Sequence, residues 1–147
     1  MKKIVFVFLF ISSFVFSQQN YNLKKGYVAE GYDVVEYFNN KAKKGSKKFE
    51  TTFNDVKFKF ISAKNVETFK ANPEKYTPQD GGYCAYAIGK SAEKVSVNPK
   101  TFEIRAGKLY LFYNAWGTNT LEFWTNEGAK DLREKADINW KKIVSKK

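Results

Sequence analysis

The sequence predicts an α+β domain in which small antiparallel β-hairpins pack with helices and the C-terminal region is helical. Two segments alternate apolar and polar residues on both sides of a short turn, which is typical of half-buried antiparallel strands. A third segment, residues 120–144, spaces its apolar residues at helical intervals. The chain has 147 residues, enough for one hydrophobic core. We therefore expect a single folded domain over residues 30–147.

The first 17 residues have the composition of a secretory signal peptide. Two lysines precede an apolar run over residues 4–16, and a cleavage point follows Ser17. The run is shorter than the roughly 20 residues that a membrane span needs, so we expect no stable membrane anchor. We expect an exported protein, periplasmic or extracellular after cleavage near Ser17.

The segment after the signal peptide is expected to be irregular. Residues 18–29 form a lead-in to the domain, of which 18–25 are mainly polar and predicted to be loose. Residues 26–38 mix aromatic residues with glycines, which indicates irregular structure with a short strand or a turn of helix. Residues 41–48 are basic and contain Gly and Ser, so they are predicted to form a loop.

The first hairpin is predicted over residues 49–60, with its turn at Asn54-Asp55. The alternating residues that we expect to face inward are Phe49, Thr51, Phe53, Val56, Phe58 and Phe60. A helix over residues 63–71 should follow, because Ser62 is a good N-cap and Pro73 disfavours helical backbone in the residue before it. Residues 78–82 are rich in turn formers and lead to Tyr83 and Cys84.

The second hairpin is predicted over residues 102–111, with Ala106-Gly107 as its turn. Residues 120–144 should then be mainly helical, with a break near Asp137. The residues of this region that we expect to face inward are Phe123, Trp124, Leu132, Ile138, Trp140 and Ile143.

Several of these segments, in order, resemble the secreted bacterial YHS-domain proteins. The matching segments are 31–38 (GYDVVEYF), 45–46, 56–60 (VKFKF), 72–76 (NPEKY), 81–86 (GGYCAY), 107–111 (GKLYL) and 136–140 (ADINW). Together they cover roughly residues 30–140. The resemblance implies a fold related to small metal-handling domains, in some of which cysteines bind copper or another heavy metal. Relatives that handle metal carry a cysteine where this chain has residues 33–35.

Cys84 is the only cysteine, and the chain contains no histidine. A closed zinc site needs four ligands, and copper(I) prefers several thiolate, thioether or imidazole ligands. Cys84 is therefore the candidate metal ligand, but one chain supplies a poor ligand set around it. Two chains sharing Cys84 in a dimer, metal-bridged or disulfide-linked, would supply two thiolates, although a monomer is expected.

The candidate functional residues are Cys84 and its neighbours Tyr83 and Tyr86. The main hypothesis is a non-enzymatic module that binds a small ligand or a metal complex near Cys84. An alternative is an enzyme or redox protein that uses Cys84 as a thiolate or cofactor ligand, with Lys90 or Lys94 as the activating cation. The remaining interpretation is structural: Cys84 is a buried apolar thiol at the start of a short element.

The net charge bears on two further kinds of binding partner. The formal net charge is +11, which leaves open a basic polyanion-binding protein. Nearly all the cations are lysines, whereas sequence-specific nucleic-acid readers favour arginine, so no specific nucleic-acid partner is expected. The carboxylates Asp33, Asp80, Glu93 and Glu103 form no recognisable acid/base pair in the sequence, and no catalytic residue is assigned.

Overall fold

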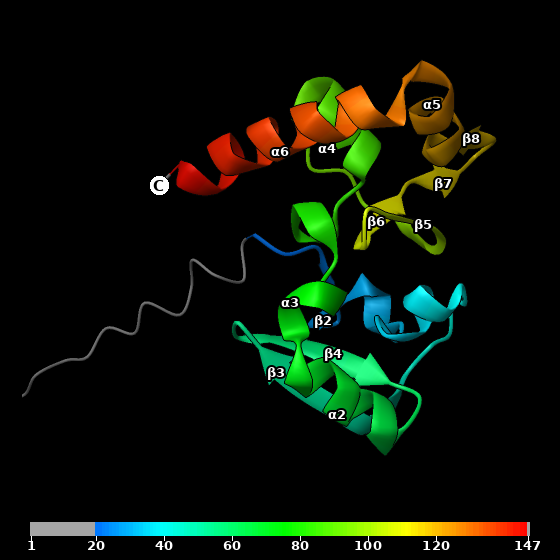
Figure 1. Ribbon diagram of the computed structural model, residues 1–147, viewed down its shortest axis with the longest axis vertical. Coiled ribbons are helices and arrows are strands. Elements are labelled where there is room, and N and C mark those ends of the chain that lie inside the picture. The colour runs from blue at the N-terminus through cyan, green and yellow to red at the C-terminus, as the bar shows by residue number, and fades with distance from the viewer. Residues whose placement is uncertain (1–19, 147) are drawn as a thin grey trace, which may run out of the picture.

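The computed structural model describes residues 20–146 and has the predicted α+β class (Figure 1). The predicted signal peptide over residues 1–17 lies outside the described residues. None of the helices within residues 20–146 is both long and apolar enough to cross a bilayer. Figure 1 shows two halves, one built on the first hairpin and the other on the C-terminal helices, which meet at β6 and the segment before α4.

The first half contains a four-stranded sheet with strand order β1-β2-β4-β3. The first predicted hairpin is confirmed as β3 (Ser46–Phe53) and β4 (Val56–Phe60), paired antiparallel. Asn54 and Asp55 form its turn with φ of 50° and 63°, the left-handed values that a two-residue hairpin turn requires. β3 begins inside the segment 41–48, so the prediction of a loop there was wrong for its last residues.

The N-terminal lead-in contributes to this sheet. β1 (Leu23–Lys24) pairs with β2 (Tyr27–Val28), and β2 pairs in parallel with β4. The expectation of a loose segment over residues 18–25 was therefore wrong at β1, because the backbone there is paired across the sheet. Val28 is fully buried, so the folded core begins before residue 30.

The apolar face of the first hairpin is covered by α2 (Ala63–Ala71). The Ser62 side chain accepts a hydrogen bond from the Asn65 backbone N–H at 3.1 Å, which confirms the predicted N-cap. Phe69 of α2 lies 4.6 Å from the Phe58 ring and 5.2 Å from the Phe60 ring, centre to centre. The helix ends at Ala71, and α3 (Pro73–Tyr76) begins at the proline.

The second hairpin is confirmed as β5 (Asn98–Arg105) and β6 (Lys108–Phe112). β6 is buried on both faces. Leu109 and Leu111 belong to the core of the first half, while Tyr110 and Phe112 belong to the core of the second half. The second core also contains Ala85, Trp124, Ala129 and Leu132. One strand therefore joins the two cores through alternating side chains.

The second half is otherwise helical, with α4 (Ala85–Ser91), α5 (Thr120–Glu127) and α6 (Ala129–Ser145). Short elements complete the described chain: η1 (Ala29–Gly31), η2 (Glu36–Asn39), η3 (Gln79–Gly82), β7 (Asn114–Ala115) and β8 (Thr118–Asn119). α6 packs closely on α4 because Gly89 has no side chain. A Cβ at this position would lie only 2.5 Å from the Leu132 carbonyl oxygen.

Two predictions for the C-terminal region were wrong. The helical break lies at Gly128, where φ is 107°, and α6 runs without interruption through Asp137. Glycine adopts this left-handed backbone at little cost, so it separates α5 from α6. Phe123 is 41% exposed because α5 buries Thr120 and Trp124 instead, and Ile138 is 56% exposed because Ala129, Leu132 and Ala136 form the buried face of α6.

Replacing Phe58, which is 1% exposed, tests the packing of the first half. We expect Phe58→Ala to lower the free energy of unfolding by about 3–5 kcal/mol, because a large cavity would remain among Phe60, Phe69 and their neighbours. Trp116→Ala is the control, since Trp116 is 97% exposed, and should change stability by less than about 0.5 kcal/mol. Urea unfolding measures both. A loss below about 1 kcal/mol for Phe58→Ala would contradict this packing.

Candidate functional site

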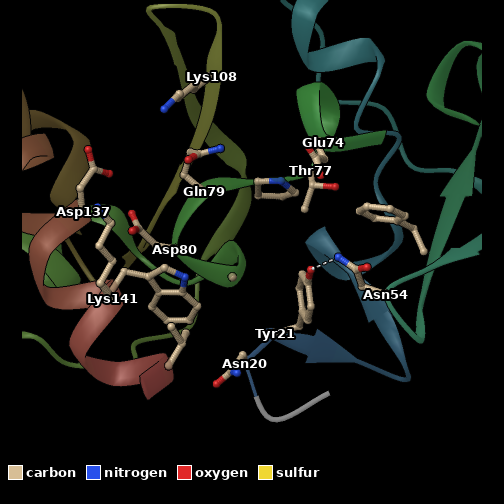
Figure 2. Close-up of a pocket in the computed structure, with 15 residues that line it drawn as sticks. Asn20, Tyr21, Asn54, Glu74, Thr77, Gln79, Asp80, Lys108, Asp137 and Lys141 are labelled. Atoms are coloured by element: carbon tan, nitrogen blue, oxygen red, sulfur yellow. Dashed lines mark hydrogen bonds between the residues drawn. The ribbon is translucent and has the colours of Figure 1, made fainter. Parts of the chain in front are cut away.

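A cleft of about 610 Å³ lies where the two halves meet (Figure 2). This volume is in the range of small-molecule binding sites. One wall comes from η3, the start of β6 and the C-terminal part of α6, and the other from the β3–β4 turn, α3 and the first described residues. In Figure 2, Gln79, Asp80, Asp137 and Lys141 lie across from Tyr21, Asn54, Thr77 and Glu74.

The backbone at Gly81 holds this wall together. A Cβ there would lie 2.0 Å from the Asn20 carbonyl oxygen and 2.8 Å from the Trp140 ring, and φ is 62°, so only glycine fits. The Gly81 carbonyl also accepts a hydrogen bond of 2.8 Å from the Asn22 N–H. The N-terminal segment and α6 therefore both meet η3 at Gly81, beside Asp80.

Asp80 is the most unusual group in the cleft. It is only 4% exposed, and its Oδ2 atom has no hydrogen-bond partner among the described residues. Burial, and secondarily the negative charge of Asp137, raise the pKa of Asp80 to about 7. Buried polar atoms are nearly always paired, so folding removes this carboxyl oxygen from water without a compensating hydrogen bond from the described residues.

A second buried polar atom without a partner in the described chain lies behind this wall. The hydroxyl of Tyr110, on β6, accepts and donates no hydrogen bond. Burial is the main cause that raises the pKa of Tyr110 to about 12, and the charges of Asp137 and Asp80 contribute while Arg133 opposes them. The phenol therefore stays neutral at physiological pH.

Aromatic and charged side chains complete the lining. Trp140 lines the cleft, and its ring centre lies 6.1 Å from that of Tyr83. Lys94 Nζ lies 5.9 Å from the centre of the Trp140 ring. The ionisable residues of the lining besides Asp80 are Tyr21, Glu74, Lys108, Asp137 and Lys141. The cleft thus combines aromatic surface with charges of both signs.

Cys84 does not line this cleft. The residue is fully buried at the start of α4, which confirms the predicted position at the beginning of a short element. Its Sγ atom lies 3.2 Å from the Thr120 hydroxyl oxygen, and its N–H donates to the Val95 carbonyl at 2.9 Å. In the part of the chain that the structure describes, no cluster of three His, Cys, Asp or Glu residues is arranged to hold a metal ion.

Tyr83 and Tyr86, the other predicted site residues, diverge from each other. The Tyr83 hydroxyl donates to the Tyr21 carbonyl at 3.3 Å. The Tyr86 hydroxyl donates to Glu127 at 2.8 Å, and Glu127 also pairs with Lys90 at 2.6 Å. Lys90 is thus bound to a carboxylate, and the three predicted site residues do not converge on one cavity.

The carboxylates noted in the sequence have different roles. Asp33 is buried and accepts hydrogen bonds from the backbone of Val35 and Ile61 and from Asn65, so it holds the first half together. Glu103 accepts from Trp124 and pairs with neighbouring Arg105. Asp80 alone among these buried carboxylates of the described chain has an oxygen without a partner. No local signal in the sequence indicates that Asp80 lies near Asp137 of α6, so this proximity was not predicted.

Comparisons of the chain with protein-family models, with curated proteins and with solved structures find no match. The resemblance to YHS-domain proteins therefore stays a prediction. The candidate site is the cleft itself, which is large enough for a small molecule and has the buried residue Asp80 in its wall.

The stability of the protein should depend on pH through Asp80. The pKa of this carboxyl is 3.8 in its ordinary state and about 7 in the folded chain. The folded state binds the proton more tightly, so the contribution of Asp80 is fully present below about pH 4 and is lost as the pH rises through 7. At about 1.4 kcal/mol per pKa unit, the loss is of the order of 4 kcal/mol.

Asp80→Asn removes this titration and preserves the shape of the side chain, and asparagine tolerates the left-handed backbone at this position, where φ is 54°. We expect the variant to be more stable than the unsubstituted protein at pH 8 and about equally stable at pH 4, as measured by urea unfolding. Glu93→Gln, which changes an exposed carboxylate outside the cleft, should show no such difference. An equal change in the free energy of unfolding at both pH values for Asp80→Asn would contradict the raised pKa of Asp80.

The thiol of Cys84 should be protected in the folded protein. Because its side chain is fully buried against Thr120, we expect alkylating reagents at neutral pH to label it slowly and to label it rapidly once urea unfolds the chain. The matched control is Ala92→Cys in a Cys84→Ala background, since Ala92 is exposed just after α4 and should label at once. Fast labelling of native Cys84 would make the thiol a candidate for chemistry.

Proposed function

We propose that this chain is an exported, non-enzymatic binding module of the YHS type that holds a small ligand in the cleft beside Asp80. The observation that carries the proposal is a cleft of about 610 Å³ that is lined by aromatic rings and by charged and amide side chains, with the buried residue Asp80 in its wall.

The rest of the lining supports ligand binding. Small-molecule sites combine apolar or aromatic walls with a few polar groups that orient the ligand. Here the aromatic surface comes from Tyr21, Phe53 and Trp140, and Asn54 is held in place by a hydrogen bond of 3.3 Å to the Tyr21 hydroxyl. The cleft therefore offers a ligand both aromatic contact area and polar groups that would fix its orientation.

The proposed binding site is the cleft beside Asp80 and not the surroundings of Cys84. A reactive thiolate needs a partly exposed, electropositive setting, whereas Cys84 is fully buried beside a neutral hydroxyl. The enzyme or redox alternative built on Cys84 has correspondingly less support. The surroundings of Cys84 also do not fit the copper or other soft metal that the family resemblance suggests, because Thr120 supplies a hard oxygen and the chain contains no second cysteine and no histidine.

An NMR titration tests the proposal. The three tryptophans supply three indole N–H signals at well-separated places: Trp140 in the cleft, Trp124 in the core and Trp116 on the surface. We expect compounds from a panel of small cationic, anionic, zwitterionic and neutral polar molecules to shift the Trp140 signal and leave the other two in place.

Variants at two tryptophans sharpen the test. Trp140→Ala should weaken binding of any hit at least about tenfold, because the aromatic wall is lost, whereas Trp116→Ala should leave it unchanged. Thermal unfolding checks that both variants fold. If no member of the panel shifts Trp140 at millimolar concentration, or if the shifts centre on α4 and Cys84, the proposed cleft is wrong.

A further inference from the structure

We propose that the side of this protein away from the cleft docks reversibly on an anionic lipid bilayer, with a lysine-rich segment against the headgroups and Trp116 in the interface. The lysine-rich segment is residues 41–48 (KAKKGSKK). The strength of peripheral binding comes from buried apolar area together with the attraction of basic residues to anionic lipids. The chain offers both contributions, and neither feature lines the cleft of the proposed function.

The lysine-rich segment presents positive charge that the described residues do not neutralise. It contains no acidic residue, and its five lysines are all exposed: Lys41, Lys43, Lys44, Lys47 and Lys48. Within residues 20–146, Lys43 lies 4.0 Å from Glu36, and the other four lysines form no ion pair. Like charges held this close together repel one another, and an anionic surface relieves that repulsion.

The backbone holds the lysine-rich segment in place. The Lys43 carbonyl accepts a hydrogen bond of 2.8 Å from the Asp33 N–H. Gly45 lies directly on β4, since a Cβ there would be 2.5 Å from the carbonyl carbon of Lys59. The lysines therefore project from a fixed backbone, and binding does not have to order a loop first.

Trp116 supplies the apolar contribution. Its side chain is 97% exposed, more than any other large apolar side chain of the described residues. It forms the turn between β7 and β8 together with Gly117, and both residues have left-handed φ, of 54° and 77°. The hairpin over residues 114–119 contains no charged residue. An exposed indole at the tip of an uncharged hairpin suits the bilayer interface, where tryptophan is enriched.

The fold brings these two features to the same side of the molecule. The β7–β8 hairpin is bound to β5, because Asn98 Nδ2 donates to the Asn114 carbonyl at 3.3 Å. η2, which precedes the lysine-rich segment, also contacts β5, through a hydrogen bond of 2.6 Å from the Tyr37 hydroxyl to the Pro99 carbonyl. In Figure 1 the β7–β8 hairpin and the segment between η2 and β3 both lie on the edge opposite the C-terminus. One flat surface can therefore meet both.

The composition of this side favours a bilayer over a soluble polyanion. The cations of the segment are all lysines, which act as point charges, whereas recognition of individual phosphate groups favours the arginine fork. A soluble polyanion would engage the lysines and leave Trp116 in water. A bilayer offers both a layer of negative charge and an interface that accepts the indole.

Vesicle co-sedimentation tests the proposal. The protein used begins at Gln18, which retains every described residue and removes the apolar run over residues 4–16 that would itself partition into lipid. Vesicles of phosphatidylcholine alone are compared with vesicles that contain roughly one-third phosphatidylglycerol. We expect at least about tenfold tighter binding to the anionic vesicles at about 50 mM salt, and loss of most of this binding at about 300 mM salt, because salt screens exposed charges.

Two charge variants with the same net charge test the lysine-rich segment. Lys44→Gln with Lys47→Gln should weaken binding to anionic vesicles about tenfold or more, since each lysine near the surface contributes to the attraction. The matched control is Lys135→Gln with Lys142→Gln, which removes two exposed lysines from α6 and should weaken binding by less than about threefold. Thermal unfolding confirms that both variants are folded.

The role of Trp116 has its own measurement. Trp116→Ala should weaken binding at least about fivefold, whereas Ile138→Ala, which shortens an exposed apolar side chain on α6, should leave it unchanged. Acrylamide quenching of tryptophan fluorescence should fall when the unsubstituted protein binds anionic vesicles, because the indole leaves water. In Trp116→Ala the quenching should not change.

Three results would overturn the proposal. The first is equal binding to vesicles with and without phosphatidylglycerol, and the second is unchanged binding after the substitutions at Lys44 and Lys47 or at Trp116. The third is binding to soluble polyphosphate without binding to vesicles, which would assign the lysines to a soluble polyanion. None of these results bears on the cleft, which the tryptophan titration tests separately.

Discussion

The two halves of this protein depend on one strand that is buried on both faces. Along β6, Leu109 and Leu111 pack into the core around the first hairpin, and Tyr110 and Phe112 pack into the core under the C-terminal helices. Because side chains alternate along a strand, a single five-residue segment can serve two cores. Each half then has a fixed position relative to the other.

The cleft is a consequence of that junction. The two halves are joined through β6 and η3, and they leave a gap between the β3–β4 turn and the end of α6. Gly81 closes the base of this gap by letting the N-terminal segment and Trp140 approach the same backbone. The buried carboxyl of Asp80 is placed beside this contact, where packing removes water from it while leaving a cavity in front. Ionisation of Asp80 therefore destabilises the fold, because burial penalises the charged carboxylate.

The sequence predicted a strand or helix well wherever that element's own residues carry the pattern that specifies it. Alternation about Asn54-Asp55 and about Ala106-Gly107 identified both hairpins, and Ser62 and Pro73 identified both ends of α2. The errors lie where tertiary contacts overrule composition. β1 forms from a polar lead-in because β2 pairs with β4, and Ile138 is exposed because alanines allow α6 to pack closely on its other face.

The sequence by itself determined the α+β class, the two hairpins, the helix after the first of them, and the scarcity of soft metal ligands that follows from one cysteine and no histidine. The burial of Cys84 was also predictable, because a lone thiol usually behaves as a small apolar residue. Only the tertiary structure decided the candidate site. Asp80 and Asp137 are 57 positions apart in the chain, and neither has a local signature. Their proximity arises because α6 packs on η3 at Gly81, a contact that depends on side-chain shape and that no short segment encodes.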